Sequence, residues 1–392
     1  MPALSEIEKQ FEKTKPFKGL KITVSVHLEA KTANLALVLK KGGAEVFLTG
    51  CNPLSTQDDV AAAVSELGIE TFGKYGVSYE EYEYLLEKAL ECRPNLIVDD
   101  GGDLINLLCG KRKDLASELF GGCEETTTGI IRLKAREREN LLPCAMMAVN
   151  DAKAKHYYDN KYGTGQSVWT AIMDVTNLIV AGKTVVVAGY GWCGKGIAMR
   201  AKGMGANVII TEIDAFKALD ATMDGFSIMP MSEAAKKGDV FVTATGCKDV
   251  ITKEHFENMK DGAILCNAGH FDCEVNVKQL SEMATKISER RKNIVGYTLK
   301  NGRELRVLGE GRLVNLACGN GHPAEIMDMS FSVQALSLKW LTENRDNLQS
   351  KLYNVPDSID EEIGNFKLKA MGLKIDTLSN EQKEYLSGWN AD

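Results

Sequence analysis

The residues of this chain best suited to acid–base chemistry are a lysine and an aspartate four positions apart, Lys155 and Asp159. On a helical turn this spacing places the two side chains on one face. The common meaning of such a pair is an ion pair on the protein surface. If the pair is buried, a desolvated lysine with a lowered pKa can take a proton from an alcohol while the aspartate positions it. The spacing therefore leaves two interpretations, a surface ion pair and a general base.

The segment from Glu124 to Gly129 places two glutamates directly before three threonines. Three threonines suit an exposed edge strand, but two preceding acids do not help a sheet. Hydroxyl groups and a carboxylate on one loop instead suit a polyol ligand such as a ribose. We expect a ribose-binding loop here, with a solvated edge strand as the alternative.

Three more polar residues, His27, Asn52 and Asp100, stand at the ends of predicted strands. Open α/β sheets bind ligands just beyond the carboxyl ends of their strands. A single polar residue there is more often satisfied locally, but three together favour a site. The chain has five histidines, and His27, His270 and His322 all fall in polar motifs of this kind.

The element that most clearly positions a ligand is the glycine-rich run 189–196. It follows the apolar run 184–188 and opens into a predicted helix at 197–201, and a second apolar run, 208–210, ends beside Glu212. This order of strand, glycine turn, helix, strand and acid is that of a dinucleotide-binding unit. The helix N-terminus can hold a pyrophosphate, and Glu212 can accept from a ribose 2′-OH and repel a 2′-phosphate, which predicts NAD rather than NADP. The glycines expected at the cofactor are Gly189, Gly191 and Gly194.

The first half of the chain repeats the α/β pattern. Predicted strands at 22–26, 46–48 and 95–98 and a helix at 31–40 indicate a second unit of the same class. The chain is too long for one core of common size. The expected fold is α/β with two doubly wound parallel-sheet domains, one of them a Rossmann NAD-binding domain, and a short C-terminal tail. The expected boundaries are a substrate-binding domain at 1–150 completed by about 324–354, an NAD-binding domain at 166–321, and a tail at 355–392.

Composition excludes several classes of partner. The net charge of −7 argues against nucleic acid, because no basic excess exists to displace phosphate counterions. No apolar run reaches the roughly 20 residues of a membrane helix, and the N-terminal segment is not typical of a secretory signal. The ten cysteines form no Cys-x-x-Cys pair and no Cys/His cluster at metal-ligand spacing, so we expect no metal and a reducing, cytoplasmic compartment.

Across nearly its whole length the chain resembles the S-adenosylhomocysteine hydrolase family. The resemblance rests on separated motifs, which are 27–33, 52–59, 99–104, 124–129, Asn150-Asp151 with Asp159-Asn160, the glycine loop, 211–214, 266–271 and 312–322. It implies a hydrolase of nucleoside thioethers that holds NAD tightly and returns it unchanged. Homocysteine and a nucleoside are the implied products, and the implied assembly is a homo-oligomer, a tetramer or a dimer.

The resemblance also implies roles for individual residues. Lys155 is the implied base for the ribose 3′-OH, oriented by Asp159 beside Asn160. Glu125 is expected to hydrogen-bond the ribose hydroxyls, and Asp100 and His27 to manage protons at the 4′ and 5′ carbons. The expected substrate contacts are Glu29, Lys31, Thr32, His270, Asn320, His322 and Met327. The expected NAD contacts beyond the glycine loop are Thr126, Thr127, Thr128, Glu212, Asn267 and Asn315.

The chain departs from the family pattern where the purine is read. Common members carry Thr at the position of Glu29, Gln or Glu at that of Lys31, and Met at that of Asn320. Lysine cannot accept a hydrogen bond from the N6 amino group of adenine, but with Glu29 it offers a donor and an acceptor that suit O6 and N1–H of hypoxanthine. S-adenosylhomocysteine is the family default and S-inosylhomocysteine the alternative. A simpler possibility is that Glu29 and Lys31 only neutralise each other.

Other departures and other classes of function also remain. Thr164 stands where Cys is usual, and the usual Lys and Tyr ending that crosses to a neighbouring subunit's NAD is absent, which predicts easier NAD exchange. An NAD-dependent hydroxy-acid dehydrogenase shares the fold but does not explain Lys155 and Asp159 beside Glu125. A non-catalytic NAD-binding regulator is the third class.

Overall fold

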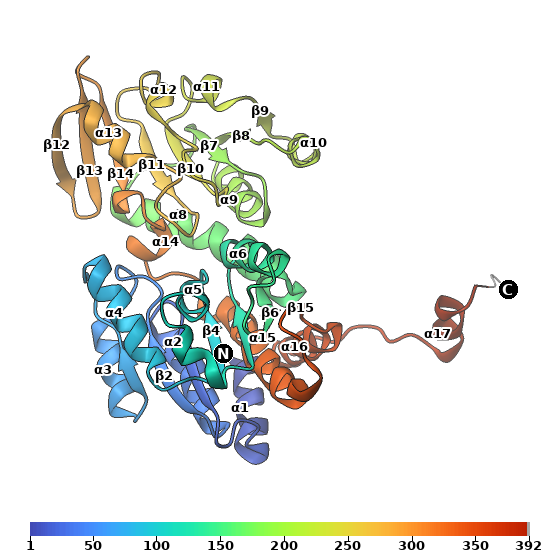
Figure 1. The fold of residues 1–392 in the computed structure, drawn as a ribbon. Coiled ribbons are helices and arrows are strands. Elements are labelled where there is room, and N and C mark those ends of the chain that lie inside the picture. Colours follow the sequence, from blue (N-terminus) through green and yellow to red (C-terminus); the bar gives the residue numbers. More distant parts are fainter. Residues whose placement is uncertain (390–392) are drawn as a thin grey trace.

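Two separate β-sheets form the frame of the molecule, which is described here from a computed structural model covering residues 1–389 (Figure 1). The first sheet has seven strands in the order β15-β6-β5-β4-β1-β2-β3, all parallel. Its strands are β1 (Lys21–Ser25), β2 (Glu45–Thr49), β3 (Glu70–Phe72), β4 (Leu96–Asp99), β5 (Gly121–Glu124), β6 (Ala145–Ala148) and β15 (Leu352–Asn354).

Helices cover both faces of the first sheet, because its strands are apolar on both sides. In β4, Leu96 and Val98 belong to one core and Ile97 to the other, as the alternation of side chains along a strand requires. One core includes α1, α2, α15 and α16, and the other includes α4, α5 and α6. The helices of this domain are α1 (Pro2–Thr14), α2 (Ala30–Lys41), α3 (Asp58–Glu66), α4 (Tyr79–Leu90), α5 (Asp103–Cys109), α6 (Thr127–Arg138), α15 (Ala324–Asn344) and α16 (Asp357–Ala370).

The second sheet has eight strands in the order β12-β13-β14-β11-β10-β7-β8-β9. The six neighbouring strands β14-β11-β10-β7-β8-β9 are parallel to one another. Strands β13 and β12 extend the sheet beyond β14 as antiparallel strands. Its strands are β7 (Thr184–Ala188), β8 (Asn207–Thr211), β9 (Ser227–Ile228), β10 (Val240–Thr243), β11 (Ile264–Asn267), β12 (Ala284–Arg291), β13 (Ile294–Leu299) and β14 (Glu304–Leu308).

The helices of the second domain also pack on both faces of their sheet, and α8 runs between the two domains (Figure 1). They are α8 (Thr164–Thr176), α9 (Trp192–Gly203), α10 (Ala215–Met223), α11 (Met231–Ala234), α12 (Lys253–Phe256), α13 (Val277–Met283) and α14 (Val314–Ala317). The chain enters this domain through α7 (Lys153–Lys155) and a π-helical stretch, His156–Gly163, and leaves it through α15. The α/β class with a Rossmann-like unit is confirmed.

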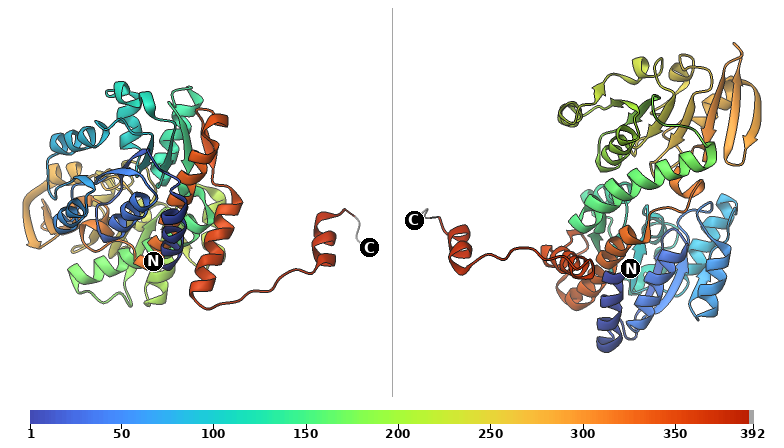
Figure 2. Two further views of the ribbon diagram at one scale, coloured as in Figure 1. Left: turned by 90° about the horizontal axis from the view of Figure 1, so that it is seen from below. Right: turned by 180° about the vertical axis from the view of Figure 1, so that it is seen from behind.

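The segment after residue 355 starts as part of the first domain. Helix α16 buries Ile359 and Ile363 against α1 and α15. Beyond it an extended stretch leads to α17 (Asn380–Ser387), which projects away from the rest of the chain (Figure 2). The final residues of the expected tail, 390–392, lie outside the described residues.

Candidate active site

A single cavity of about 1230 Å³ collects most of the predicted site residues, and both domains line it. The predicted residues that line it are His27, Glu29, Lys31, Thr32, Asp100, Glu125, Thr126, Thr127, Thr128, Lys155, Asp159, Asn160, Gly189, Gly191, Glu212, His270, Asn315, His322 and Met327. The other predicted residues, Asn52, Gly194, Asn267 and Asn320, do not line it. On the first domain, the catalytic candidates follow the carboxyl ends of neighbouring parallel strands, which is where an open α/β sheet forms its crevice.

The Lys155 ammonium group is buried at the centre of a polar cluster. Its Nζ donates to Asn160 Oδ1 at 2.7 Å and to Asn150 Oδ1 at 3.3 Å. It forms ion pairs with Asp159 Oδ1 at 3.4 Å and Glu125 Oε1 at 3.7 Å, and its side chain is 6% exposed. The wide π-helical turn after α7 lets Asp159 and Asn160 both approach the same ammonium group. The interpretation of Lys155 and Asp159 as a surface ion pair is therefore excluded.

Electrostatics in this cluster differ from the expectation for Lys155. Burial alone would lower the pKa of Lys155, but Asp159 and Glu125 outweigh burial and raise it. The expected lowered pKa is thus wrong for the protein without ligands, because two carboxylates from different segments converge on one ammonium. Burial pushes the pKa of Glu125 upward, and the Lys155 ammonium opposes that shift. Burial would also raise the pKa of Asp159, yet Lys155 and His322 hold it below its usual range.

Helix α15 supplies two partners that the sequence analysis missed. Ser330 Oγ donates to Asp159 Oδ2 at 2.8 Å, and Gln334 Nε2 donates to Glu125 Oε2. Both residues are fully buried and lie four positions apart, so they share one helical face. Polar residues at that spacing, interleaved with the apolar residues of a long helix, are the signal that could have identified them. Their bonds orient the two carboxylates that flank Lys155.

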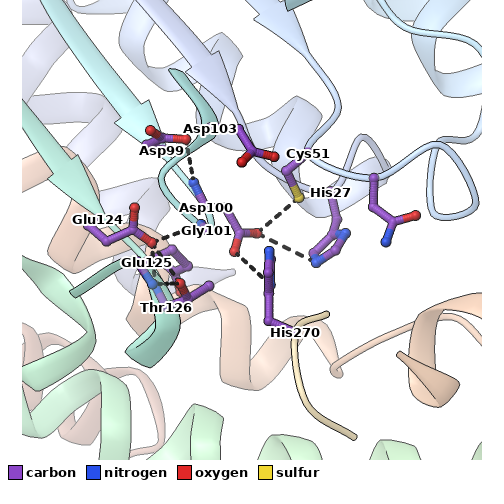
Figure 3. A network of polar contacts seen from close by, with 12 residues as sticks. His27, Cys51, Asp99, Asp100, Gly101, Asp103, Glu124, Glu125, Thr126 and His270 are labelled. Atoms are coloured by element: carbon purple, nitrogen blue, oxygen red, sulfur yellow. Dashed lines mark hydrogen bonds and ion pairs between the residues drawn. The ribbon is translucent and has the colours of Figure 1, made fainter. Parts of the chain in front are cut away.

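A second polar cluster surrounds Asp100 (Figure 3). Its carboxylate lies 3.5 Å from His27 Nε2, 3.8 Å from His270 Nδ1 and 3.3 Å from Cys51 Sγ. Burial raises the pKa of Asp100 and lowers the pKa of His27 to about 3 and of His270 to about 4. Near neutral pH both histidines are therefore uncharged and can accept or donate a proton at the cavity.

In each of the acidic pairs Asp99-Asp100 and Glu124-Glu125, the first acid bonds to backbone groups and the second faces the cavity. Asp99 accepts from the backbone N–H groups of Leu104 and Ile105. Glu124 Oε1 accepts from the N–H of Gly101 and from both the N–H and hydroxyl of Thr126 (Figure 3). The second acid of each doublet, Asp100 or Glu125, lines the cavity. The structural acids thus hold the loops that aim the cavity-facing acids.

The threonines after Glu125 belong to a helix start. Thr126 is the N-cap of α6, with its hydroxyl oxygen accepting from Gly129 N–H at 2.8 Å. Thr127 and Thr128 form the first turn of that helix and line the cavity. The alternative of a solvated edge strand is wrong, because the capping bond favours the helix.

The glycine loop between β7 and α9 fits a dinucleotide. A Cβ on Gly194 would lie 1.9 Å from the Gly189 carbonyl oxygen, so only glycine allows the helix to start this close to the strand. A Cβ on Gly191 would meet nothing within 4 Å, and Gly191 faces the cavity. Glu212 follows β8 and accepts from the N–H groups of Tyr190, Ile213 and Asp214, which holds its carboxylate at the cavity edge.

Asn315 and Asn267 behave differently at the far end of this domain. Asn315 lines the cavity, and its buried Oδ1 has no hydrogen-bond partner among the described residues, as expected for an atom that receives a ligand's donor. Asn267 instead uses all of its amide within the protein: Nδ2 donates to the carbonyls of Gly269 and Phe271, while Oδ1 accepts from Gly269 N–H and Thr243. Asn267 therefore shapes the loop that carries His270, and its side chain has no capacity left for a direct NAD contact.

The segment expected to read the purine forms an ion pair. Lys31 Nζ lies 2.8 Å from Glu29 Oε2 and donates to the main-chain carbonyl of Asn320 at 3.0 Å. Glu29 caps helix α2 by accepting from Lys31 N–H. The Asn320 residue is exposed and does not line the cavity, so it acts here through its carbonyl rather than through the expected side-chain contact with a base.

Comparison with known families matches both domains. The sequence model of the S-adenosyl-L-homocysteine hydrolase family matches residues 1–119, and the model of that family's NAD-binding domain matches residues 160–321. NAD is therefore the cofactor of this chain, in agreement with the glycine loop and the unpartnered Asn315 Oδ1. No helix among the described residues is long and apolar enough to cross a membrane.

Curated relatives cover almost the whole chain. The S-inosyl-L-homocysteine hydrolase of Methanocaldococcus jannaschii is 56% identical over 99% of this chain and 94% of its own length. The adenosylhomocysteinase of Pyrococcus abyssi is 54% identical over 99% of this chain and 92% of its own length. The S-inosyl-L-homocysteine hydrolase of Methanococcus maripaludis is 55% identical over 99% of this chain and 94% of its own length. Two matching family models and relatives of this similarity, together with a cavity that joins an NAD loop to a buried lysine cluster, show that this chain belongs to the S-adenosyl-L-homocysteine hydrolase family.

Proposed function

We propose that the protein catalyses the reversible, NAD-dependent hydrolysis of S-adenosyl-L-homocysteine to adenosine and L-homocysteine. The observation that carries this proposal is the buried Lys155, held by Glu125, Asp159 and two asparagines in the same cavity as the glycine loop. A simple dehydrogenase of hydroxy acids has no need for this cluster beside a ribose-binding loop, and the comparisons indicate no dehydrogenase.

The chemistry accounts for the types of residue present. A thioether at the ribose 5′ carbon is a poor leaving group, but a ketone at the 3′ carbon acidifies the neighbouring 4′ C–H and allows homocysteine to leave by elimination. Water then adds at the 5′ carbon before the ketone is reduced again. Bound NAD supplies the reversible hydride acceptor that this series of reaction steps needs at the 3′ carbon.

Lys155 is the group proposed to take the proton of the 3′-OH. It can do so only after losing its own proton, which the neighbouring carboxylates oppose. Asp159 and Asn160 would hold the Lys155 nitrogen in place, and Glu125 Oε1, which lacks a hydrogen-bond partner among the described residues, would accept from a ribose hydroxyl. Asp100 and His27 are the groups proposed to carry protons at the 4′ and 5′ carbons.

The experiment is incubation of the protein with S-adenosyl-L-homocysteine and no added NAD. Release of homocysteine without net accumulation of NADH supports the proposal. Stoichiometric NADH would instead indicate a dehydrogenase, and no reaction would indicate a non-catalytic NAD-binding protein. Stripping the bound NAD should abolish turnover and re-addition should restore it, so activity that survives complete NAD removal would contradict the proposal.

A second candidate substrate is S-inosyl-L-homocysteine, and the Glu29–Lys31 pair favours it. The Lys31 ammonium has three N–H groups and commits two of them to Glu29 and the Asn320 carbonyl. The third can donate to O6 of hypoxanthine, while Glu29 can accept from N1–H. Adenine has the reverse pattern, with a donor at N6 and an acceptor at N1. A Lys31 ammonium placed opposite position 6 would therefore set its own donor against the N6 amino donor.

The kcat/KM values for the two thioethers test this candidate. A mispaired buried polar group costs about 1–3 kcal/mol, which corresponds to about 5- to 150-fold in specificity. We expect Lys31→Gln to shift the ratio toward the adenosyl compound by that factor, whereas Lys153→Gln, on an exposed lysine, leaves the ratio unchanged. An adenosyl preference that is identical in wild type and Lys31→Gln would remove Lys31 from base recognition.

We also propose that the protein acts in the cytoplasm as a homo-oligomer, a tetramer or a dimer. Exposed apolar side chains on and beside α17, among them Leu378, Leu386 and Trp389, support association with another copy. Ten free cysteines are consistent with a reducing compartment. Light scattering of the purified protein tests the assembly, and a monomer at micromolar concentration would contradict it.

A further inference from the structure

Arg132 on α6 contacts both domains of the protein at once. Its Nη1 donates to the Gly101 carbonyl at 2.8 Å and to Asp103 Oδ1 at 3.3 Å, both in the first domain. Its guanidinium carbon lies 4.3 Å from the centre of the Phe271 ring, which follows β11 of the second domain. A guanidinium at this distance over an aromatic face forms a cation–π contact. An ordinary surface ion pair with Asp103 would account for only one of these three contacts.

Two of the groups that Arg132 contacts also touch His270. Phe271 is the next residue in the chain, and its ring packs edge-on against the His270 ring with the centroids 4.7 Å apart. His270 Nε2 approaches Gly101 so closely that no room is left for a Cβ at that position. Gly101 has a φ of +106°, a conformation that favours glycine. The His270 ring therefore packs on the backbone of the first domain while it belongs to the second.

Other hydrogen bonds fix the backbone on both sides of the Arg132 side chain. Gly101 N–H donates to buried Glu124 at 2.9 Å, and Asn267 Nδ2 donates to the Phe271 carbonyl at 2.8 Å. Arg132 thus links two segments that are each held within their own domain. Its guanidinium suits this task, because its donors point outward in the plane while its flat face stacks on a ring.

We propose that Arg132 is a positioning residue that holds His270 against Asp100 at the cavity. His270 Nδ1 lies 3.8 Å from Asp100 Oδ1, and the two groups come from different domains (Figure 3). A relative movement of the domains would change this separation, and the contacts of Arg132 oppose such a movement. The consequence for catalysis rests on the proposed function, whereas the placement of the His270 ring does not.

The charge state of His270 reports the position of its ring without any turnover. Burial is the largest influence and lowers the pKa of His270 to about 4. Of the charged and titratable groups that face the ring, Asp100 raises this pKa, whereas His27, Arg132 and Lys155 lower it. A ring that leaves this environment becomes hydrated, so we expect its pKa to rise toward 6.5.

The experiment is an NMR titration of the imidazole rings in the NAD-loaded protein, with His270→Gln to assign the signal. Arg132→Lys keeps the positive charge but has no planar group to stack, and Phe271→Leu keeps Arg132 but removes the ring. We expect the pKa of His270 to rise by about one pH unit or more in both variants. Arg136→Met should titrate like the wild type. It is the matched control, because Arg136 lies one helical turn later on α6 and donates to Asn106 instead.

Steady-state kinetics test the consequence for the proposed reaction. In Arg132→Lys we expect KM for the nucleoside thioether to rise about fivefold, as for the loss of one exposed cation–π contact, with a smaller change in kcat. Phe271→Leu should have the same effect. The double variant should be no worse than the poorer single variant, because both substitutions remove one shared contact. A residue with only a structural role would lower thermal stability and leave KM unchanged.

An unchanged pKa of His270 in either Arg132→Lys or Phe271→Leu would overturn the proposal. Additive effects of the two substitutions on KM, or an equal shift in Arg136→Met, would overturn it as well. The Arg132 side chain is 39% exposed, so its replacement should not prevent folding, which thermal unfolding checks. Because the titration needs neither substrate nor turnover, a failure of the proposed hydrolase activity leaves its result readable.

Discussion

The two sheets of this protein share one strand order but place different chemistry at their carboxyl ends. In the first, the order β3-β2-β1-β4-β5-β6 ends in a histidine, two acidic doublets and the buried Lys155. In the second, the corresponding order β9-β8-β7-β10-β11-β14 ends in glycines, backbone N–H groups, neutral Asn267 and a single acid at the cavity edge, Glu212. One topology therefore carries the groups proposed for proton transfer in one half and the NAD-binding loop in the other.

The difference lies in what the buried acids do. In the second domain, buried Glu274 accepts from the N–H groups of Thr245 and Gly246, so its charge holds a loop. In the first, Asp99 and Glu124 do the same, but an additional acid follows each of them and faces the cavity. A second acid directly after the structural one thus places a carboxyl group in the cavity. The two acids together require more charge to be buried.

The largest effect is expected from replacing Lys155 in the first domain, whose strand ends carry the buried charges. Lys155→Ala removes the proposed base and should lower the rate of 3′-oxidation by about 10²–10⁴-fold while nucleoside still binds. Lys155→Arg keeps the positive charge but cannot deprotonate, so it should be equally slow. The measurement is the transient NADH absorbance after nucleoside is added.

Lys153→Ala is the matched control, because Lys153 lies two residues earlier and pairs with Asp357 at the surface. It should retain near-normal turnover. Normal NADH formation in Lys155→Arg would show that charge, and not proton transfer, is what Lys155 supplies.

The next largest effect is expected from substitutions in the glycine loop of the second domain. Gly194→Ala places a Cβ against the Gly189 carbonyl and should cost about 1–3 kcal/mol of unfolding free energy, because backbone must move. Gly203→Ala, in the same helix, meets nothing within 4 Å and should be neutral or stabilising. Denaturant unfolding compares the two, and equal stability would refute the tight-turn argument.

Gly191→Ala sharpens the comparison by separating folding from cofactor binding. Because its Cβ would meet no protein atom within 4 Å, the variant should unfold like the wild type. The added methyl group would occupy space that the bound dinucleotide needs, and NAD affinity should fall by about tenfold or more, which is about 1.4 kcal/mol. Calorimetric titration with NAD is the measurement, and unchanged affinity would place the pyrophosphate elsewhere.

The effect that is smallest at neutral pH, and that grows only on acidification, is a pH dependence of stability in the first domain. Burial lowers the pKa of His27 from 6.5 to about 3, so the unfolded chain binds a proton there that the folded chain does not. Stability from this group is present above pH 6.5 and is lost as pH falls toward 3, by up to about 1.4 kcal/mol per pH unit. His27→Gln should remove this slope between pH 4 and 6.5 in denaturant unfolding.

His156→Gln is a useful comparison for that slope, because burial lowers the pKa of this half-buried histidine as well, but outside the Asp100 cluster. A His27→Gln variant with the wild-type pH profile would mean that the His27 pKa is not depressed in the folded protein.

Much of the fold followed from local sequence. The run 184–188 coincides with β7 and the run 208–210 lies within β8, since apolar β-branched residues bounded by glycine or polar residues specify a buried strand. The glycine loop and Glu212 were also placed correctly by order along the chain. Local patterns could not predict the surroundings of each polar residue. The Asn267 side chain is fully hydrogen-bonded within the protein, and Asn320 acts through its main-chain carbonyl.

By itself, the sequence determined the α/β class and the NAD loop, because these rest on short-range spacing, and the family, because its motifs recur along the chain. Most of the site residues that it predicted do line the cavity. Only the tertiary structure decided the electrostatics. Lys155 has a raised rather than a lowered pKa because Glu125, thirty positions away, joins Asp159 at its ammonium group. Ser330 and Gln334 reach the same cluster from α15, and Cys51 reaches Asp100, because neighbouring parallel strands bring distant segments to one edge of a sheet, where burial strengthens every charge–charge interaction.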